Sequence, residues 1–289
     1  MKQSSGILLL VLAAMIWGLS FVAQTVSTSY VGPWTFNGIR FFLGFLTLLP
    51  FVLKRKAQLQ GKWKHTLFGA LCCGLVLSIA SVLQQSGMAS TSTGKAGFIT
   101  SLYILIVPFL SLFLGKKITL KHWLCVVLAL FGMYLLCGTT KGGFGKGELL
   151  VLACAFCFAI HILVIDHFKD TDGVALSAFQ FLFAGIISLC FMPTEHPEMG
   201  AIRQIIVPLL YSGIMSCGVA YTLQVIGQKI VEPSKAVMPL SLESVFSTIF
   251  GFLILKQSLT VQELLGCAIV FASVILCQME FPKKDQSIT

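Results

Sequence analysis

Charged side chains are scarce in this sequence. Only 11% of its 289 residues are Asp, Glu, Lys or Arg, whereas 56% are hydrophobic. A soluble domain carries about 25% charged residues, because a surface in contact with water must be largely polar. The shortage excludes a water-soluble globular domain of this length and indicates that lipid solvates most of the chain. The net charge of +9 does not indicate a nucleic-acid partner, because the basic residues lie in short gaps between apolar runs, as membrane-flanking anchors do.

Several chemical motifs are also absent. The glycine-rich stretch at residues 142–147 has no Ser or Thr after its Lys, so no phosphate loop of an ATP-driven pump is present. There are no paired carboxylates, no HExxH and no Gly-x-Ser-x-Gly. All ten cysteines lie in apolar runs, so we expect no disulfide framework. We interpret Cys154 and Cys157, spaced as C-x-x-C, as packing residues, and we expect neither a cofactor nor a metal.

What is present is a series of long apolar runs. Each has about twenty residues, the length that one spanning helix needs. We place ten of them at about residues 6–26, 35–53, 66–87, 93–114, 120–138, 147–166, 174–192, 205–226, 234–255 and 261–279. The runs are continuous rather than alternating, which favours helices over outer-membrane strands. We therefore predict an all-α membrane protein with ten transmembrane helices, the first of which is a span and not a cleaved signal peptide.

The basic residues are distributed unevenly between the two sets of loops. Fourteen of the 20 fall on the side that carries both predicted termini, five fall on the other side, and Arg40 lies within a span. Because cytoplasmic loops carry the excess of Lys and Arg, we predict a multi-pass protein of the cell membrane with both termini in the cytoplasm.

The second half of the chain repeats the first. At an offset of 141, and of 140 after a one-residue slip, identical residues coincide: Gly6 with Gly147, Gly44 with Gly185, Gln84 with Gln224, and Lys95-Ala96 with Lys235-Ala236. We predict two five-helix repeats, residues 1–140 and 141–289, the second ending in a short cytoplasmic tail. Because five is odd, the second repeat enters the membrane from the opposite side, which makes an inverted repeat typical of secondary transporters.

Short motifs add a family resemblance. The chain resembles the EamA family of the drug/metabolite transporter superfamily over about residues 6–138 and 147–279. The matching residues are Trp17-Gly18-Leu19-Ser20-Phe21, Arg40, Gly94-Lys95-Ala96, Pro108 and Gly115-Lys116. The resemblance implies export of small metabolites, often amino acids or drugs, through a central cavity lined by spans one to four and six to nine. The chain departs from the family at Lys116 and Lys256, where the family often has an acidic residue.

Among the charged residues, Glu243 is the one expected near the membrane midplane. It lies about 14 Å into the ninth run, at 1.5 Å of rise per residue. A charge at this depth costs several kcal/mol, so it is a functional candidate by default. Glu243 either binds a proton or a substrate ammonium group, or it hydrogen-bonds a neighbouring helix and holds the bundle together. Its repeat-related partner, at offset 140, is Tyr103.

Further polar and aromatic residues complete the candidate site for substrate binding or coupling. Arg40 either anchors the membrane interface or attracts an anionic group, and His161 is either a ligand or a hydrogen-bonded structural residue. Ser244 and Ser247 belong to a stripe at helical spacing that faces either a cavity or another helix. The remaining candidates are Tyr103, Trp17, Ser20, Gln84 and Gln224.

These observations favour a carrier that works by alternating access, as an exporter of an amino acid or a drug-like compound. Its expected partners are a small-molecule substrate, the lipid bilayer and protons as a candidate coupling ion, with no nucleic acid. The alternative is an intramembrane enzyme that uses Glu243 and His161. The inverted repeat favours the carrier. Substrate identity, direction, coupling ion and oligomeric state stay open.

Overall fold

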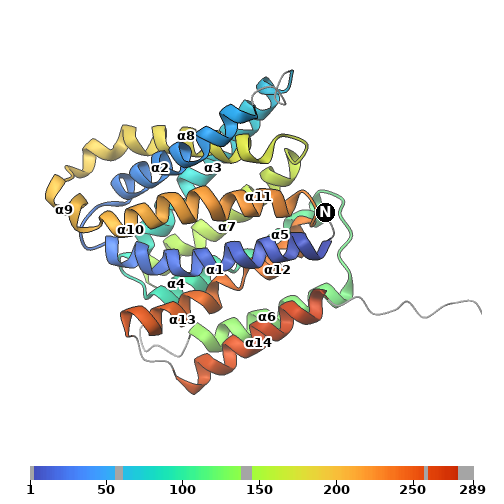
Figure 1. Ribbon diagram of the computed structural model, residues 1–289. Helices are drawn as coiled ribbons and strands as arrows, with labels where there is room; N and C mark the ends of the chain where they lie inside the picture. Colours follow the sequence, from blue (N-terminus) through green and yellow to red (C-terminus); the bar gives the residue numbers. More distant parts are fainter. Residues whose placement is uncertain (1–2, 56–60, 138–144, 257–259, 279–289) are drawn as a thin grey trace, which may run out of the picture.

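The protein folds as a bundle of helices. A computed structural model describes residues 3–55, 61–137, 145–256 and 260–278, and every regular element in these ranges is a helix. Most helices lie lengthwise beside one another (Figure 1), which confirms the all-α prediction for the described residues. The predicted ends at residues 138 and 279, the repeat boundary at 140 and 141, and residues 142–144 of the glycine-rich stretch lie outside the described ranges. So do five of the basic residues in the loop tally: Lys2, Lys56, Lys141, Lys283 and Lys284.

The first half begins with three long helices. They are α1 (Gln3–Ser27), α2 (Pro33–Lys54) and α3 (Trp63–Met88). A pair of shorter helices follows, α4 (Thr93–Thr100) and α5 (Tyr103–Phe113), and the half ends with α6 (Leu120–Cys137).

The second half has the same order with more interruptions. It begins with α7 (Lys146–His167) and α8 (Gly173–Phe191), followed by the single turn η2 (Met192–Glu195) and α9 (Met199–Gln204). Next come α10 (Ile206–Leu210), η3 (Tyr211–Tyr221) and α11 (Thr222–Gln228). The last helices are α12 (Pro233–Leu240), α13 (Glu243–Leu255) and α14 (Val261–Gln278).

Eight helical segments among the described residues are long and apolar enough to cross a membrane, so the chain is a multi-pass membrane protein. They coincide with eight of the ten predicted runs. The other two, α6 and α14, have apolar segments of Leu120–Leu135 and Leu264–Cys277, which are shorter than the others. Large apolar side chains cover the outside of the bundle, including Phe113, Leu120 and Val261, each more than 70% exposed. Such a surface is stable against lipid and unfavourable in water.

Small residues bring the helices close together. A Cβ atom on Gly132 of α6 would lie 2.9 Å from the carbonyl oxygen of Gly266 in α14, and these two helices lie side by side along one edge of the bundle (Figure 1). Gly18 of α1 lies against the backbone of Phe246 in α13 in the same way. Helices in lipid gain little from hydrophobic burial, so close van der Waals packing of this kind stabilises the bundle.

Two spans are interrupted at matching positions. The helix breaks between Thr100 and Tyr103 and again between Leu240 and Glu243, which are the same positions at an offset of 140. In each break one backbone N–H bonds the carbonyl three residues back, Leu102 to Ile99 at 3.2 Å and Leu242 to Pro239 at 3.3 Å. The break therefore does not need a proline, because Ile99 occupies the position that Pro239 has in the second half.

The eighth predicted run is not a plain α-helix. Its central part, Tyr211–Tyr221, is a π-helix, whose wider turns are rare and often occur at functional sites. On one side of this segment Gly213 and Gly218 lie against α2, next to Leu43 and Thr47. The sequence shows an apolar run of spanning length here, and length and hydropathy do not indicate which helix type forms.

A carboxylate from the second half holds the start of α2. Glu195 accepts hydrogen bonds from the backbone N–H groups of Trp34 and Thr35, both at 2.8 Å, and from the Thr35 hydroxyl at 2.7 Å. The first N–H groups of a helix have no partner within the helix, and a negative charge there also meets the positive end of the helix dipole. Glu195 thus ties the loop after α8 to α2.

We expect Glu195→Ala to lower the free energy of unfolding by about 1 to 2 kcal/mol, because two capping bonds of α2 are lost. Thermal unfolding of the detergent-solubilised protein measures this. Glu198→Ala is the matched control, because Glu198 is exposed and makes no ion pair among the described residues. Equal unfolding temperatures of the two variants would contradict the capping role.

Candidate functional site

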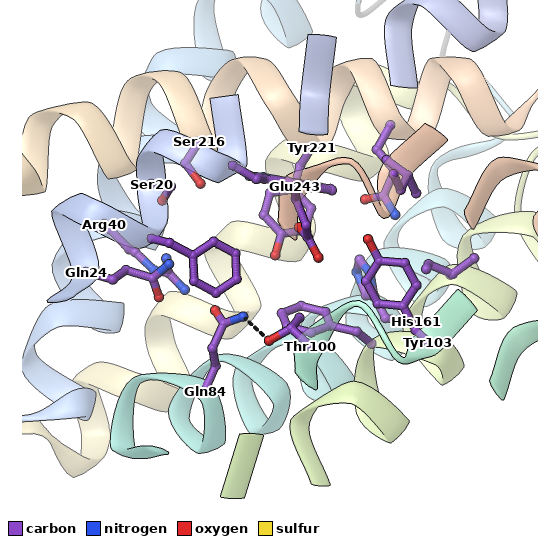
Figure 2. A pocket seen from close by; sticks show the side chains of 16 residues that line it. Ser20, Gln24, Arg40, Gln84, Thr100, Tyr103, His161, Ser216, Tyr221 and Glu243 are labelled. Atoms are coloured by element: carbon purple, nitrogen blue, oxygen red, sulfur yellow. Dashed lines mark hydrogen bonds between the residues drawn. The ribbon is translucent and has the colours of Figure 1, made fainter. Parts of the chain in front are cut away.

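A cavity of about 40 Å³ lies inside the bundle, where polar side chains from both halves converge (Figure 2). The first half contributes residues of α1, α2, α3, α4 and α5, and the second half residues of α7, η3, α11, α12 and α13. The lining consists of Trp17, Ser20, Phe21, Gln24, Arg40, Gln84, Thr100, Tyr103, Phe158, His161, Ile162, Ser216, Tyr221, Gln224, Leu240 and Glu243.

Eight of the ten residues predicted from the sequence line this cavity. They are Glu243, Tyr103, Trp17, Ser20, Arg40, His161, Gln84 and Gln224. The other two, Ser244 and Ser247, lie outside the lining. Their hydroxyls donate to carbonyls of their own segment, at 2.7 Å to Ser241 and at 2.9 Å to Ser244. Gly97 of α4 lies directly against Ser247, so this polar stripe faces a neighbouring helix and not the cavity.

Twelve of the sixteen lining residues form pairs that the repeat relates. At an offset of 141, Trp17 corresponds to Phe158, Ser20 to His161, and Phe21 to Ile162; at 140, Gln84 corresponds to Gln224, Thr100 to Leu240, and Tyr103 to Glu243. Equivalent positions of the two halves therefore meet around one cavity. Three of the six pairs differ in chemistry, namely Ser20 and His161, Thr100 and Leu240, and Tyr103 and Glu243, so the cavity is chemically asymmetric.

Glu243 is the carboxyl group of the cavity. It is the first residue of α13, directly after the break that follows α12, and only 4% of it is exposed. The Ser101 hydroxyl, from the matching break, donates to Glu243 Oε1 at 3.4 Å. The buried Tyr103 hydroxyl lies beside the same carboxyl group. The two breaks thus bring a carboxyl, a hydroxyl and a phenol together in the middle of the bundle.

His161 is held by α8. Its Nε2 atom lies 2.9 Å from Oε1 of Gln180, and its ring meets the Tyr221 ring edge-on at 5.9 Å between centroids. The residue is fully buried, and its Nδ1 atom has no partner among the described residues. One ring nitrogen is therefore occupied by a structural contact, while the other is free to meet a molecule in the cavity.

Arg40 is buried, contrary to the interpretation of it as an interfacial anchor. It is 2% exposed, and its guanidinium carbon lies 5.3 Å from the Phe36 ring centroid and 5.0 Å from the Phe41 ring centroid. Among the described residues it makes no ion pair. Its Nε atom has no hydrogen-bond partner either. Aromatic faces attract a cation, but they do not accept the directed hydrogen bonds that a guanidinium offers.

Some buried polar atoms of the lining have no hydrogen-bond partner among the described residues, as do others elsewhere in the bundle. Those of the lining belong to Arg40, His161, Trp17, Ser20, Gln24 and Gln224. Buried polar groups are usually hydrogen-bonded, and a group of exceptions indicates a place for water or a ligand. The cavity offers donors and acceptors together with aromatic walls, which is the usual composition of a small-molecule site.

Metal chemistry has no support among the described residues. No group of three or more His, Cys, Asp or Glu side chains is placed to hold a metal ion there. Cys154 is buried and Cys157 half-buried in α7, and both are free thiols.

Two ion pairs tie α4 and α5 to α7. Lys95 lies 2.8 Å from Glu148 near the starts of α4 and α7, and Lys116 lies 2.7 Å from Asp166 just after α5 and at the end of α7. Lys116 stands where the family often has an acidic residue, and in this chain it is the basic partner of an ion pair. The repeat-related positions of the two acids are Ile7 and Thr25, which carry no charge.

Sequence reasoning did not assign the other lining residues to the site. Phe158 is the repeat-related partner of Trp17, which was predicted, so the offset could have identified it. Ile162 and Leu240 correspond to Phe21 and Thr100, which were not assigned either. Ser216 and Tyr221 lie in the π-helix, and no sequence signal indicated which face of that segment points inward.

Comparison with known proteins identifies similar chains. The profile of the EamA-like transporter family matches residues 4–138 and 145–278. An uncharacterized transporter of Archaeoglobus fulgidus is 32% identical over 93% of this chain and 84% of its own length. The uncharacterized transporter YoaV of Bacillus subtilis is 24% identical over 93% of this chain and 95% of its own. A solved crystal structure superposes with a TM-score of 0.78 over 96% of this chain and 97% of its own, at 22% identity, and so shares the fold.

We expect Ser20→Cys to react with a small thiol reagent faster than Ser244→Cys, because Ser20 lines the cavity and Ser244 does not. Both serines are buried, so overall burial does not decide the difference. The modification rate of each variant is measured by mass spectrometry, with the unmodified chain giving the background of the native cysteines. A faster reaction at Ser244→Cys would mean that the polar stripe faces the cavity after all.

Proposed function

This chain belongs to the EamA-like transporter family, and from that premise we propose that it is a secondary active transporter of the cell membrane. It moves a small metabolite, an amino acid or a drug-like compound, by alternating access in the direction of export. Its two halves, residues 1–140 and 141–289, are inverted five-helix repeats that together cross the membrane ten times, with both termini in the cytoplasm.

The observation that carries this proposal is the cavity with its repeat-related lining. In a transporter built from inverted repeats, the substrate site lies between the repeats, near the bilayer midplane. Here six pairs of equivalent residues surround one cavity, and Glu243 is its carboxyl group.

Contacts near the helix ends support an inverted two-fold relation. Gly6 near the start of α1 packs against Gly227 near the end of α11, and each would place a Cβ 3.2 to 3.4 Å from the carbonyl oxygen of the other. Gly147 near the start of α7 packs in the same reciprocal way against Gly87 near the end of α3. At the two offsets, Gly6 corresponds to Gly147 and Gly87 corresponds to Gly227. One contact is therefore the repeat-related copy of the other.

The size of the cavity supports a mechanism with two conformations. At about 40 Å³ the cavity is well below the size of a usual small-molecule site. The substrate therefore needs the lining helices to separate, first on one side of the membrane and then on the other. The breaks at Thr100–Tyr103 and Leu240–Glu243 lie at the cavity and provide matching positions where each half bends.

Glu243 is the proposed coupling residue. A carboxyl in a low-dielectric interior is stable in its neutral form and ionises when water or a cation approaches. It can thus carry a proton through one half of the cycle and release it in the other. The titratable or charged residues around it are Tyr103 of α5, Cys154 and His161 of α7, Tyr221 of η3, and Arg40 of α2.

An enzymatic role has less support. It would need Glu243 and His161 to act on one reacting atom, but one nitrogen of His161 is bonded to Gln180, and no hydrogen bond joins His161 to Glu243 among the described residues. We therefore propose that the protein is not an enzyme.

We expect Glu243→Gln to abolish the dependence of transport on a pH gradient, because the amide keeps the shape of the side chain but cannot exchange a proton. The measurement is flux of labelled amino acids and of a cationic dye in proteoliposomes, with and without a pH gradient, from pH 5 to 8. Asp170→Asn is the matched control, since Asp170 is an exposed loop carboxyl. Glu243→Gln with the wild-type response over this range would refute the coupling role.

Repeat-related positions must lie on opposite membrane faces if the repeats are inverted. Ala89 follows α3, and its partner Lys229 follows α11; both are exposed. We expect Ala89→Cys to react with an impermeant maleimide on intact cells and Lys229→Cys to react only after permeabilisation. The chain without either substitution measures labelling of its native cysteines. Labelling of both variants from the same side would contradict the inverted arrangement.

A further inference from the structure

We propose that Arg40 recognises a carboxylate of the transported molecule and so restricts the substrates to small carboxylates with an aromatic or apolar body. This inference rests on the proposed transport function and names the substrate class for the same cavity.

The charge of Arg40 has no counter-charge among the described residues. Lys95 and Lys116 each have a carboxylate within 2.8 Å, whereas Arg40 has no ion pair among the described residues although it is 98% buried. Leaving a charge buried and unpaired is strongly unfavourable. An anion that enters the cavity supplies the missing partner, so this part of the cavity favours a negatively charged group.

Arg40 is separated from Glu243 within the cavity. No ion pair joins them, and Figure 2 shows Arg40 and Glu243 in different parts of the cavity, with Arg40 next to Gln24. The carboxyl group of the protein therefore does not neutralise the guanidinium. The repeat-related partner of Arg40 is Phe181, so the cavity has this positive charge at only one of the two equivalent positions.

The guanidinium of Arg40 matches the shape of a carboxylate. A guanidinium presents parallel N–H groups that match the two oxygens of a carboxylate. Ser20, with a buried unpaired hydroxyl, and the amide of Gln24 line the cavity with Arg40 and are able to donate to the same oxygens. Arg40 is the only Lys or Arg residue in the lining of the described cavity, which suits one negative charge better than the two of a phosphate monoester.

The aromatic walls of the cavity suit an apolar ligand body. The rings of Trp17, Phe21, Phe158 and Tyr221 all line the cavity. Flat apolar walls favour an aromatic or aliphatic group, since burial of apolar surface contributes about 25 cal/mol per Å². A charged head at Arg40 and an apolar body against these rings together define the proposed class.

The test compares ligands that differ only in the head group. Binding of 3-phenylpropionate, its neutral amide 3-phenylpropanamide, and phenyl phosphate to the purified full chain is measured by isothermal titration calorimetry. We expect the carboxylate to bind at least tenfold more tightly than the amide and more tightly than phenyl phosphate. Equal binding of carboxylate and amide, no binding of the carboxylate, or tighter binding of phenyl phosphate would each overturn the proposal.

Substitutions then assign the effect to Arg40. We expect Arg40→Gln to abolish the preference for carboxylate over amide, and Arg40→Lys to lower carboxylate affinity about tenfold, because a lysine loses the two-point contact. Arg203→Gln, at an exposed position in α9, is the control and leaves the preference unchanged. If Arg40→Gln does not fold, Arg40→Lys decides, since an unchanged preference in that variant overturns the role. If the Arg40 variants keep the wild-type preference while transport still depends on Glu243, this inference is refuted and the proposed transport function is not.

Discussion

Every polar group that this chain carries into lipid must find its partner inside the protein, because the hydrocarbon offers none. That constraint explains the helices, whose backbone groups bond within each segment, and it explains the carboxylates of Glu195 and Asp172, which satisfy helix starts at the bundle ends. It also gives meaning to the exceptions. Several side chains that line one cavity keep polar atoms without a described partner, and water or a transported molecule that enters the cavity can bond to them.

Much of this arrangement was predictable from the sequence. Apolar runs located the spans, since the length that lipid demands is close to twenty residues, and the scarcity of charge singled out Glu243 and Arg40. The helix-facing direction of Ser244 and Ser247 was not predictable, because serine suits a cavity and a close helix contact equally well. The burial of Arg40 was not predictable either. Sequence depth alone allows a long side chain to reach the interface, and only the packing of Phe36 and Phe41 shows that it turns inward.

Duplication gives the two halves equivalent positions but not equivalent chemistry. Ser20 corresponds to His161, Tyr103 to Glu243, and Arg40 to Phe181. The helix breaks match as well, so equivalent positions of the two halves surround the cavity while their charges differ. Equivalent positions with different charges favour one binding orientation for a molecule with two different ends.

The ion pairs of α7 extend this asymmetry beyond the cavity. Lys95–Glu148 and Lys116–Asp166 attach both ends of the α4 and α5 segment to α7, whereas Ile7 and Thr25, the equivalent positions in α1, carry no charge. In the proposed alternating-access cycle, separating α4 and α5 from α7 would break these partly buried charge contacts. We therefore expect the two states of that cycle to differ in free energy even across a membrane without any gradient.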